Sequence, residues 1–433
     1  MERLEKQYDV IVVGGGLAGL SAAAHLSKNG KKVILMEKAK IGGRAMTVKI
    51  KGYEFNMGAH AFYGRDTSTL HTLEKELQLK MNWAEFSPDK AIYDLGQELT
   101  VIPASLKGLM ETKMLTGYNK FKFAWFILHT MLGFHKGSSN TSISEWMEEK
   151  QLSDEIKTML LTLASSNFFT NEPEQIPSDV FFNYYKKIFR TQKPVSYVRG
   201  GWQNLIEQLT QVIEDNDGEI LTKAKLTEIK IEDGKIESLL VGDEKYIADD
   251  YIFCIPPDEL HKVFKGTILE PRFMEYSNLE PTHVMFYDIG LKERVNSPYT
   301  YVYDTKNKLF ITDISYYDPN CAPENGQLLQ AIAYLNKEEA ENPETIEQYK
   351  EKIEAFYDKH FAGWRESLVV PKISKKAIVQ TIKWNMSQQG MPISFEDISN
   401  LYFAGDWCNG DGQLSELSFS SAYHVSKLIQ RNK

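Results

Sequence analysis

The sequence is poor in cysteine. Its 433 residues include three cysteines, Cys254, Cys321 and Cys408, which lie far apart in the chain. They form neither a Cys-x-x-Cys pair nor a cysteine–histidine spacing of the zinc type, so we expect no metal site. An odd, sparse set also argues against structural disulfides and favours a reducing compartment, so we predict a cytoplasmic location.

Long apolar runs and excess positive charge are missing too. No run reaches the about 18 apolar residues that a membrane-spanning helix needs. The opening stretch, Met1–Gln7, is polar and charged, which does not fit a secretory signal. The formal net charge of -9 opposes binding to phosphates, so we expect no nucleic-acid partner. The 42% of hydrophobic residues are enough for a sizeable globular core.

The chain opens with the pattern of a strand–helix–strand unit. Tyr8–Val13 is short, continuous and β-branched, as a buried parallel strand is. A helix is predicted over residues 17–29, where Asn29 and Gly30 form its stop. A second strand is predicted over Lys32–Met36. Such a unit is typical of nucleotide-binding α/β folds.

The turn between the first strand and the helix has the spacing G-x-G-x-x-G. The first glycine permits a tight turn, the second lets the backbone approach a pyrophosphate, and the third lets the helix pack closely on the strand. The helix N-terminus directs free N–H groups at the phosphates. At the end of the second strand a carboxylate accepts hydrogen bonds from ribose hydroxyls. The predicted dinucleotide-binding residues are Gly14, Gly16, Leu17, Ala18, Gly19 and Glu37.

The next segment distinguishes between dinucleotides. Lys38–Arg44 follows the second strand directly and ends in Gly42, Gly43 and Arg44, whose guanidinium can reach a phosphate. Here the sequence resembles the superfamily of flavin amine oxidases, phytoene-type desaturases and protoporphyrinogen oxidases. The resemblance implies FAD as the cofactor, with Lys38, Gly43 and Arg44 against it.

Six later segments resemble the same superfamily in the same order, among them residues 252–257, a strand that ends in Pro-Pro. The resemblance implies that residues 53–60 pass the flavin ring, that residues 200–205 re-enter the cofactor domain, and that residues 226–229 cover the adenine. It implies that residues 401–406 hold the ribityl or pyrophosphate part, and that Ser420–Ala422 opens the last helix. The further cofactor-binding residues so predicted are Gly58, Ala59, His60, Leu226, Gly405 and Asp406.

These segments predict an α/β fold. We expect a Rossmann-like FAD-binding domain, made of a parallel sheet plus a β-meander, with an inserted α+β substrate domain. The predicted FAD-binding domain comprises residues 1–80, 195–265 and 395–433, and the substrate domain comprises 81–194 and 266–394.

The function implied by the resemblance is FAD-dependent oxidoreduction. Amine oxidases usually carry a lysine on the strand where this chain has Thr282, and an aromatic residue within the stretch that here reads Asp411–Leu414. Both are missing, which favours desaturation (CH–CH dehydrogenation) of a hydrophobic substrate over amine oxidation. His60 is a weak catalytic candidate, and Cys408 is more simply a buried apolar residue than a covalent flavin link.

Other interpretations stay open. A flavin amine oxidase is the alternative within the enzyme class. A non-catalytic FAD-binding protein is an alternative of another class, because the strong motifs bind cofactor and do not transform substrate. A nicotinamide dehydrogenase is disfavoured by the segments that end in Arg44 and Asp406.

One segment suggests a membrane contact. Residues 110–136 interleave aromatic and aliphatic side chains with four lysines and a single acid, against the negative charge of the whole chain. This composition suits either a helix on an anionic membrane surface or an amphipathic helix of the substrate domain. We hypothesise a lipid-facing substrate entrance and peripheral membrane contact through this segment.

Overall fold

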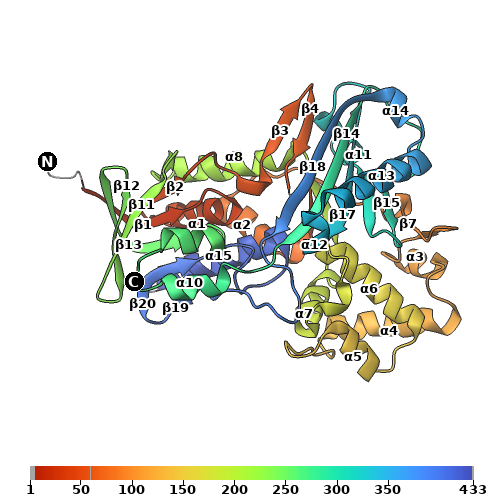
Figure 1. Ribbon diagram of the computed structural model, residues 1–433, viewed down its shortest axis with the longest axis horizontal. Coiled ribbons are helices and arrows are strands. Elements are labelled where there is room, and N and C mark those ends of the chain that lie inside the picture. The colour runs from red at the N-terminus through yellow and green to blue at the C-terminus, as the bar shows by residue number, and fades with distance from the viewer. Residues whose placement is uncertain (1–4, 59, 432–433) are drawn as a thin grey trace.

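A mixed sheet built around a parallel core forms the first part of the molecule in the computed structural model, which describes residues 5–58 and 60–431 (Figure 1). Its main path runs β10-β2-β1-β13-β12-β11, and β20 joins β13 while β19 pairs with β20. β1 pairs in parallel with β2 and β13, whereas β13, β12 and β11 form an antiparallel meander. The strands are Glu5–Val13 (β1), Val33–Glu37 (β2), Glu219–Thr222 (β10), Leu226–Glu232 (β11), Lys235–Val241 (β12), Glu244–Phe253 (β13), Ser394–Phe395 (β19) and Ile398–Phe403 (β20).

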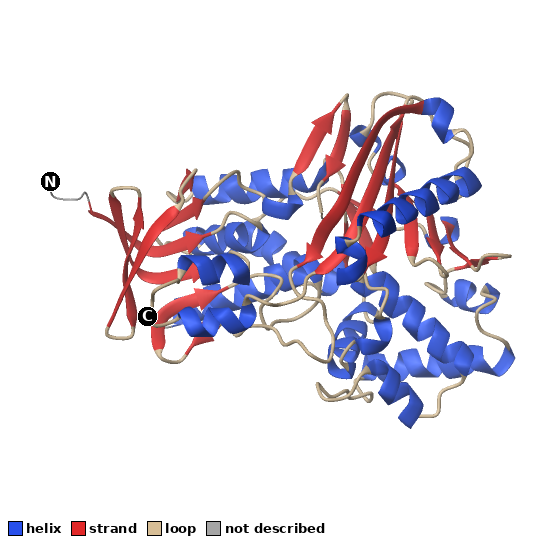
Figure 2. Ribbon diagram, in the orientation of Figure 1, coloured by secondary structure: helices blue, strands red, loops and turns tan. Residues whose placement is uncertain are grey.

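Helices cover both faces of this sheet (Figure 2). The apolar residues of β1 alternate between the two cores: Val10 and Val12 pack with α1, α8 and α15, while Ile11 and Val13 pack on the other side. This two-sided burial explains why the strand sequence is a continuous apolar run. The helices are Leu17–Lys28 (α1), Thr69–Leu77 (α2), Gly201–Glu214 (α8), Pro257–Val263 (α9), Glu270–Tyr276 (α10) and Leu414–Arg431 (α15).

The start of the last helix differs from its prediction. α15 begins at Leu414, so Ser420 and Ser421 lie within the helix and do not open it. The early turn escapes the apolar pattern because it carries Ser415 and Glu416.

A second sheet packs on helix α13 with one face, and its other face lines the cavity that is described in the next subsection. Its order is β18-β14-β17-β16-β15-β7-β8. Alternate residues of β14 point to opposite faces: Met285 and Tyr287 pack with α13, whereas Val284 and Phe286 face the other way. The elements are Ala91–Asp94 (β7), Leu99–Val101 (β8), Thr282–Leu291 (β14), Tyr301–Asp304 (β15), Leu309–Asp313 (β16), Gln327–Leu335 (β17), Leu368–Gln380 (β18) and Pro343–His360 (α13).

A helical lobe lies beside the second sheet (Figure 1). Its own core is rich in aromatic side chains, among them Phe126, Trp146 and Phe182. The lobe consists of Leu106–Glu111 (α3), Gly117–Leu132 (α4), Ile143–Glu149 (α5), Asp154–Phe168 (α6) and Ser178–Ile188 (α7). The remaining elements are Thr47–Ile50 (β3), Tyr53–Asn56 (β4), Ala61–Tyr63 (β5), Trp83–Glu85 (β6), Val195–Val198 (β9), Ile314–Tyr317 (α11), Lys337–Glu341 (α12) and Trp364–Ser367 (α14).

The predicted fold class is confirmed. The first sheet takes its strands from the three segments predicted for the cofactor domain, apart from β19, which begins one residue earlier, at Ser394. The second sheet takes all of its strands from the predicted insertions. Within the described residues, none of the helices is both long and apolar enough to span a bilayer.

Candidate functional site

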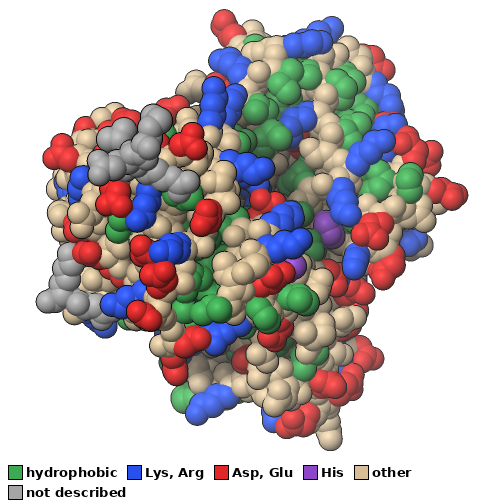
Figure 3. Space-filling view, turned by 60° about the vertical axis from the view of Figure 1, so that its left-hand side comes forward, with side chains coloured by type: hydrophobic (Ala, Val, Ile, Leu, Met, Phe, Trp, Pro, Cys, Tyr) green, Lys and Arg blue, Asp and Glu red, His purple; other side chains and the backbone are tan. Residues whose placement is uncertain are grey.

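A single large cavity connects the three parts of the molecule. Its volume is about 1410 Å³, and its wall takes residues from the glycine-rich turn, the second sheet and the helical lobe. Pockets for one small ligand are typically about 300–1,000 Å³, so this cavity has room for a dinucleotide and a second molecule. In the space-filling view the surface is hollowed between the parts, with hydrophobic side chains in and around the hollow (Figure 3).

The glycine-rich turn forms one end of the cavity. A Cβ at Gly14, whose φ is +108°, would lie 2.7 Å from the Cys254 carbonyl oxygen, and one at Gly19 would lie 1.8 Å from the Gly14 carbonyl oxygen. Gly16, by contrast, has no atom within 4 Å of its missing Cβ and lines the cavity together with Leu17 and Ala18. Gly19 is set back from the cavity wall, where it lets α1 approach β1.

The start of α1 fits a pyrophosphate. Gly16 is the N-cap of α1 and supplies no side-chain acceptor to the first N–H groups of the helix. These donors therefore remain available to an anion, and the helix dipole favours negative charge at this place. The open space over Gly16 gives the backbone access that a diphosphate needs, so the residues present fit the group.

Glu37 lies at the end of β2, where the ribose is predicted. Its Oε2 accepts a hydrogen bond from the Gly15 N–H at 2.7 Å, and its Oε1 accepts one from the Ala39 N–H at 2.8 Å. A carboxylate has about four acceptor positions, so both oxygens can still accept ribose hydroxyls. Next to it, Lys38 lines the cavity and its ammonium group pairs with Glu259.

Arg44 and Asp406 meet across the cavity wall. An Arg44 NH2 group donates to Asp406 Oδ2 at 2.7 Å, although the two residues are 362 positions apart. The Thr381 N–H and hydroxyl donate to the same carboxylate, each at 2.9 Å. Asp406 is thereby fixed in place, and Arg44 keeps further N–H donors for a phosphate. The sequence did not predict Thr381 as a contact of Asp406. Thr381 directly follows β18, and no motif around it indicates that it meets an aspartate 25 residues later in the chain.

The serines of α15 hold the loop that carries Asp406. The Ser421 hydroxyl accepts a hydrogen bond from the Gly405 N–H at 3.0 Å, and the Ser420 hydroxyl accepts one from the Asp411 N–H at 3.2 Å. Ser420 and Ser421 lie six and seven residues after the first residue of the helix, and from there they fix the loop that precedes it.

His60 and Gly58 stand over the middle of the cavity. A Cβ at Gly58 would lie 2.8 Å from the Arg44 carbonyl oxygen, so the chain passes Arg44 closely. The His60 ring packs edge-on against Phe286 with centroids 4.9 Å apart, and its Nε2 lies 3.2 Å from the Asn56 carbonyl oxygen. Burial, together with the positive charge of Lys372, lowers the pKa of His60 to about 3, so its ring is neutral at physiological pH. Ala59, between them in the prediction, lies outside the described residues.

We call the part of the cavity that is lined by the predicted FAD-binding residues the cofactor half. The glycine-rich turn lies at one end of it and β11 at the other. Leu226 lines the cavity together with Thr227 and Glu228, as the prediction of an adenine cover requires. Cys254 also lines this half, whereas the buried Cys408 is not part of the cavity wall. Burial raises the pKa of both thiols well above the usual range, so neither is a ready nucleophile.

The remaining half of the cavity is apolar and rich in tyrosine. The carboxylates among the described lining residues are Glu37, Glu228, Glu259 and Asp406, and all four belong to the cofactor half. Sequence reasoning did not single out the rest of the wall, because its residues come from strands and helices that are distant in the chain. It includes Tyr63, Tyr93, Phe169, Tyr185, Phe189, Tyr197, Tyr301, Phe310 and Ile332.

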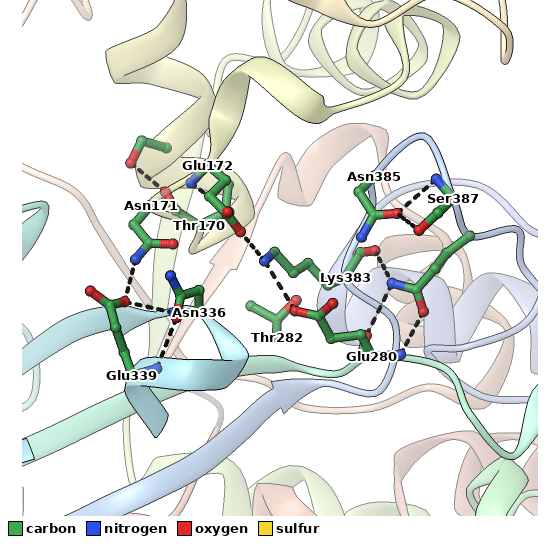
Figure 4. Close-up of polar contacts among 12 residues, drawn as sticks. Thr170, Asn171, Glu172, Glu280, Thr282, Asn336, Glu339, Lys383, Asn385 and Ser387 are labelled. Carbon is green, nitrogen blue, oxygen red and sulfur yellow. Dashed lines mark hydrogen bonds and ion pairs between the residues drawn. The ribbon is translucent and has the colours of Figure 1, made fainter. Parts of the chain in front are cut away.

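A buried lysine joins the helical lobe to the start of the second sheet (Figure 4). Lys383 Nζ forms an ion pair with Glu172, in the turn after α6, and lies 3.1 Å from Glu280 Oε1, just before β14. Burial lowers the pKa of Lys383, but the two carboxylates outweigh this effect and raise it above its usual value. The lobe that covers the cavity is therefore anchored by charge.

A buried carboxyl group lies at the start of α15. Glu416 Oε1 accepts a hydrogen bond from the Thr69 N–H at 2.7 Å, and Oε2 has no hydrogen-bond partner among the described residues. Burial raises the pKa of Glu416 to about 7.

Together, the fold and the cavity fit a dinucleotide-dependent oxidoreductase. The chain belongs to the family of flavin-containing amine oxidoreductases, whose model matches residues 17–429. The predicted flavin cofactor, FAD, and the predicted oxidoreductase class are thereby confirmed.

Individual proteins similar to this chain come from several branches. A 15-cis-phytoene desaturase from Narcissus pseudonarcissus is 24% identical over 94% of this chain and 76% of its own length. An oxidoreductase from Methanosarcina mazei superposes with a TM-score of 0.78 at 20% identity, covering 98% of this chain and all of the other. Wild-type putrescine oxidase superposes with a TM-score of 0.72 at 15% identity, covering 99% and 100%. At these identities the structural likeness establishes the fold.

Proposed function

We propose that the protein dehydrogenates a hydrophobic substrate at a CH–CH bond. The observation that carries this proposal is the chamber beyond the flavin half, whose described wall is mainly apolar and aromatic, with some uncharged polar side chains and no carboxylate. An ammonium substrate would be desolvated there without a counter-ion, which costs several kcal/mol, so amine oxidation is disfavoured. The similarity to 15-cis-phytoene desaturase supports the same substrate class.

The residues of the chain have distinct tasks in this reaction. When bound, a flavin supplies a hydride acceptor at its N5 atom. The helix start at Gly16, Glu37 and the Arg44–Asp406 pair hold and orient the cofactor. The aromatic wall positions the substrate carbon and excludes water, which keeps the hydride from side reactions. As the C=C bond forms, the substrate loses a hydride from one carbon and a proton from the next. Because burial lowers the pKa of His60 to about 3, this ring is a poor base for that proton.

The direct test is anaerobic reduction of the bound flavin, followed at its visible absorbance band. We expect bleaching with an acyclic polyene or a porphyrinogen delivered in liposomes, and none with primary amines. The variant Ile332→Glu places a charge in the apolar wall, and it should keep FAD but lose this reduction. Ile268→Glu, at a side chain that is 73% exposed, is the matched control. Bleaching by amines alone would favour amine oxidation, and bleaching by no candidate would favour a non-catalytic flavin-binding protein.

We further propose that the substrate enters from a lipid surface at α3 and α4. Leu109 and Phe123 of these helices line the cavity, while the outer side of α3–α4 exposes large apolar residues. So many large exposed apolar side chains within one short segment are unusual for a soluble monomer. Four lysines, Lys107, Lys113, Lys120 and Lys122, lie in the same segment and complement anionic headgroups. The exposed residues are Leu106, Met110, Tyr118, Phe121, Trp125, Leu128, Leu132 and Phe134.

Co-sedimentation with anionic liposomes tests this surface. The double variant Phe121→Ser/Trp125→Ser removes two side chains that are 70% and 60% exposed, and we expect binding to fall about tenfold or more per side chain. The control Ile268→Ser/Met274→Ser removes two exposed apolar residues elsewhere and should bind as the wild type does. Absence of wild-type binding at low salt, or equal loss in both variants, would contradict the proposal.

A further inference from the structure

A row of polar side chains crosses the cavity side of the second sheet. The pairing register places Asp288 of β14 opposite both Lys372 of β18 and Gln330 of β17. Gln330 is in turn opposite Thr312 of β16, which is opposite Tyr301 of β15. Directly opposed residues in antiparallel strands point to the same face, so these five side chains form one continuous band, the polar row.

The polar row borders an apolar row on the same face. Two residues along each strand, Phe286, Ile332 and Phe310 oppose one another in the same way. Ile332 and Phe310 line the cavity, and the His60 ring packs on Phe286. The wall of the substrate chamber therefore changes from apolar to polar over one step of the sheet.

Three members of the polar row reach the cavity. Gln330, Thr312 and Tyr301 line it, and the first two are only 3% and 2% exposed. An amide and two hydroxyl groups thus face a space that bulk water reaches poorly. Gln330 also interacts with Asp288, and Thr312 with Tyr197, but an amide and a hydroxyl each keep a further hydrogen-bonding position. Leaving such a position buried without a partner costs about 1–3 kcal/mol, which a wall for a pure hydrocarbon would avoid.

The other two members, Asp288 and Lys372, form an ion pair with each other. Asp288 Oδ2 lies 3.3 Å from Lys372 Nζ, with side-chain exposures of 0% and 10%, while Oδ1 has no hydrogen-bond partner among the described residues. Burial raises the pKa of Asp288 to about 6, against the opposing effects of Lys372 and Gln330. At neutral pH the carboxylate and the ammonium cancel, and the groups that face the cavity are uncharged.

We propose that the substrate is an apolar molecule carrying an uncharged oxygen group, a hydroxyl or a carbonyl, which Gln330, Thr312 and Tyr301 bind while the adjacent apolar row holds the hydrocarbon part. The Gln330 amide both donates and accepts, so it suits either group. This inference rests on the proposed function and narrows it, because a pure hydrocarbon would leave the hydrogen-bonding positions that Gln330, Thr312 and Tyr301 turn to the cavity without a partner. A site built to bind a hydroxyl discriminates against the analogue that lacks it.

A matched pair of ligands tests the proposal without turnover. Phytol and phytene share one C20 skeleton and differ by a hydroxyl group. Their dissociation constants from the FAD-loaded protein are measured by the change in the visible flavin spectrum and, independently, by equilibrium dialysis in the same detergent. We expect the wild type to bind phytol at least about tenfold more tightly than phytene, the effect of one good hydrogen bond in a dry site.

Three variants assign this preference to the row. Gln330→Leu and, as a second route if that variant fails to fold, Thr312→Val should bring the ratio close to one. Ile332→Val, in the apolar row, should weaken both ligands and leave the ratio unchanged. A wild-type ratio near one, or a ratio that both polar-row variants preserve, overturns the assignment while leaving a hydrophobic substrate intact. Failure of both ligands to bind overturns the hydrophobic substrate itself and this inference with it.

Discussion

Alanine at two glycines of the same turn should weaken FAD binding in both cases, but should lower the stability of the apoprotein at Gly19 and not at Gly16. In Gly19→Ala the new Cβ would lie 1.8 Å from the Gly14 carbonyl oxygen, whereas ordinary contact begins at 3.4 Å, so α1 must retreat by about 1.6 Å. The gain in helix propensity, about 1 kcal/mol, does not offset an overlap of this size, which costs about 1–3 kcal/mol or more. The retreat also carries the first N–H groups of α1 away from the phosphates. Loss of one charged hydrogen bond of about 1.5–3 kcal/mol raises the Kd for FAD roughly 10- to 100-fold.

In Gly16→Ala the Cβ meets no protein atom within 4 Å, and the backbone, with φ -79° and ψ -174°, is open to any residue. We therefore expect the thermal midpoint of the apoprotein to stay near wild type, while the methyl group occupies the space predicted for the pyrophosphate and weakens FAD. Titration of FAD fluorescence gives the two Kd values, and thermal unfolding of the apoproteins gives the stabilities. Wild-type FAD affinity in either variant, or equal destabilisation in both, would refute the reasoning.

Three further predictions concern buried groups. Burial raises the pKa of Glu416 from 4.5 to about 7, so the folded protein loses about 3 kcal/mol of stability as the pH rises from 4.5 to 7 and this group ionises. In Glu416→Gln the denaturation midpoint should no longer fall between pH 5 and 8. The control Glu149→Gln, at an exposed side chain, should follow the wild type. Lys383→Met leaves two part-exposed carboxylates unpaired and should lower stability by about 1–3 kcal/mol, with partial recovery in Lys383→Met/Glu172→Gln; an unchanged melting temperature would show that the anchor is dispensable. Because Cys408 is buried outside the cavity wall, acid precipitation should release all of the flavin, and yellow colour retained in the pellet would contradict the described geometry.

The cofactor half was predictable because its signals are local. The strand, turn, helix and acid from Tyr8 to Glu37 follow one another in sequence, and each has a residue requirement of its own. The individually predicted cofactor-binding residues line the cavity except for Gly19, which packs behind the wall, and Ala59, which lies outside the described residues, whereas the predicted segment 200–205 does not reach it. Their direct role in binding FAD stays a prediction.

The substrate half was not predictable for an equally physical reason. Asp288 and Gln330 meet only through strand register, and a shift of one residue would turn either side chain to the opposite face. In sequence, the apolar and aromatic composition of residues 110–136 left two interpretations open; the structure shows an amphipathic helix of the helical lobe, and the membrane contact stays a prediction. Phe123 and Phe126 are buried on one side of α4, while Phe121 and Trp125 are exposed on the other.

The ion pair between Arg44 and Asp406 can form only after almost the whole chain has been synthesised. The cofactor turn leaves the ribosome early, but the carboxylate that fixes Arg44 is made 362 residues later, on the loop after β20, which is itself a neighbour of β13 in the first sheet. At about 5–20 residues per second, that interval lasts roughly 20 to 70 s. During this time the nascent chain holds only half of the predicted nucleotide site, so we expect flavin to be captured only after almost the whole chain has been made.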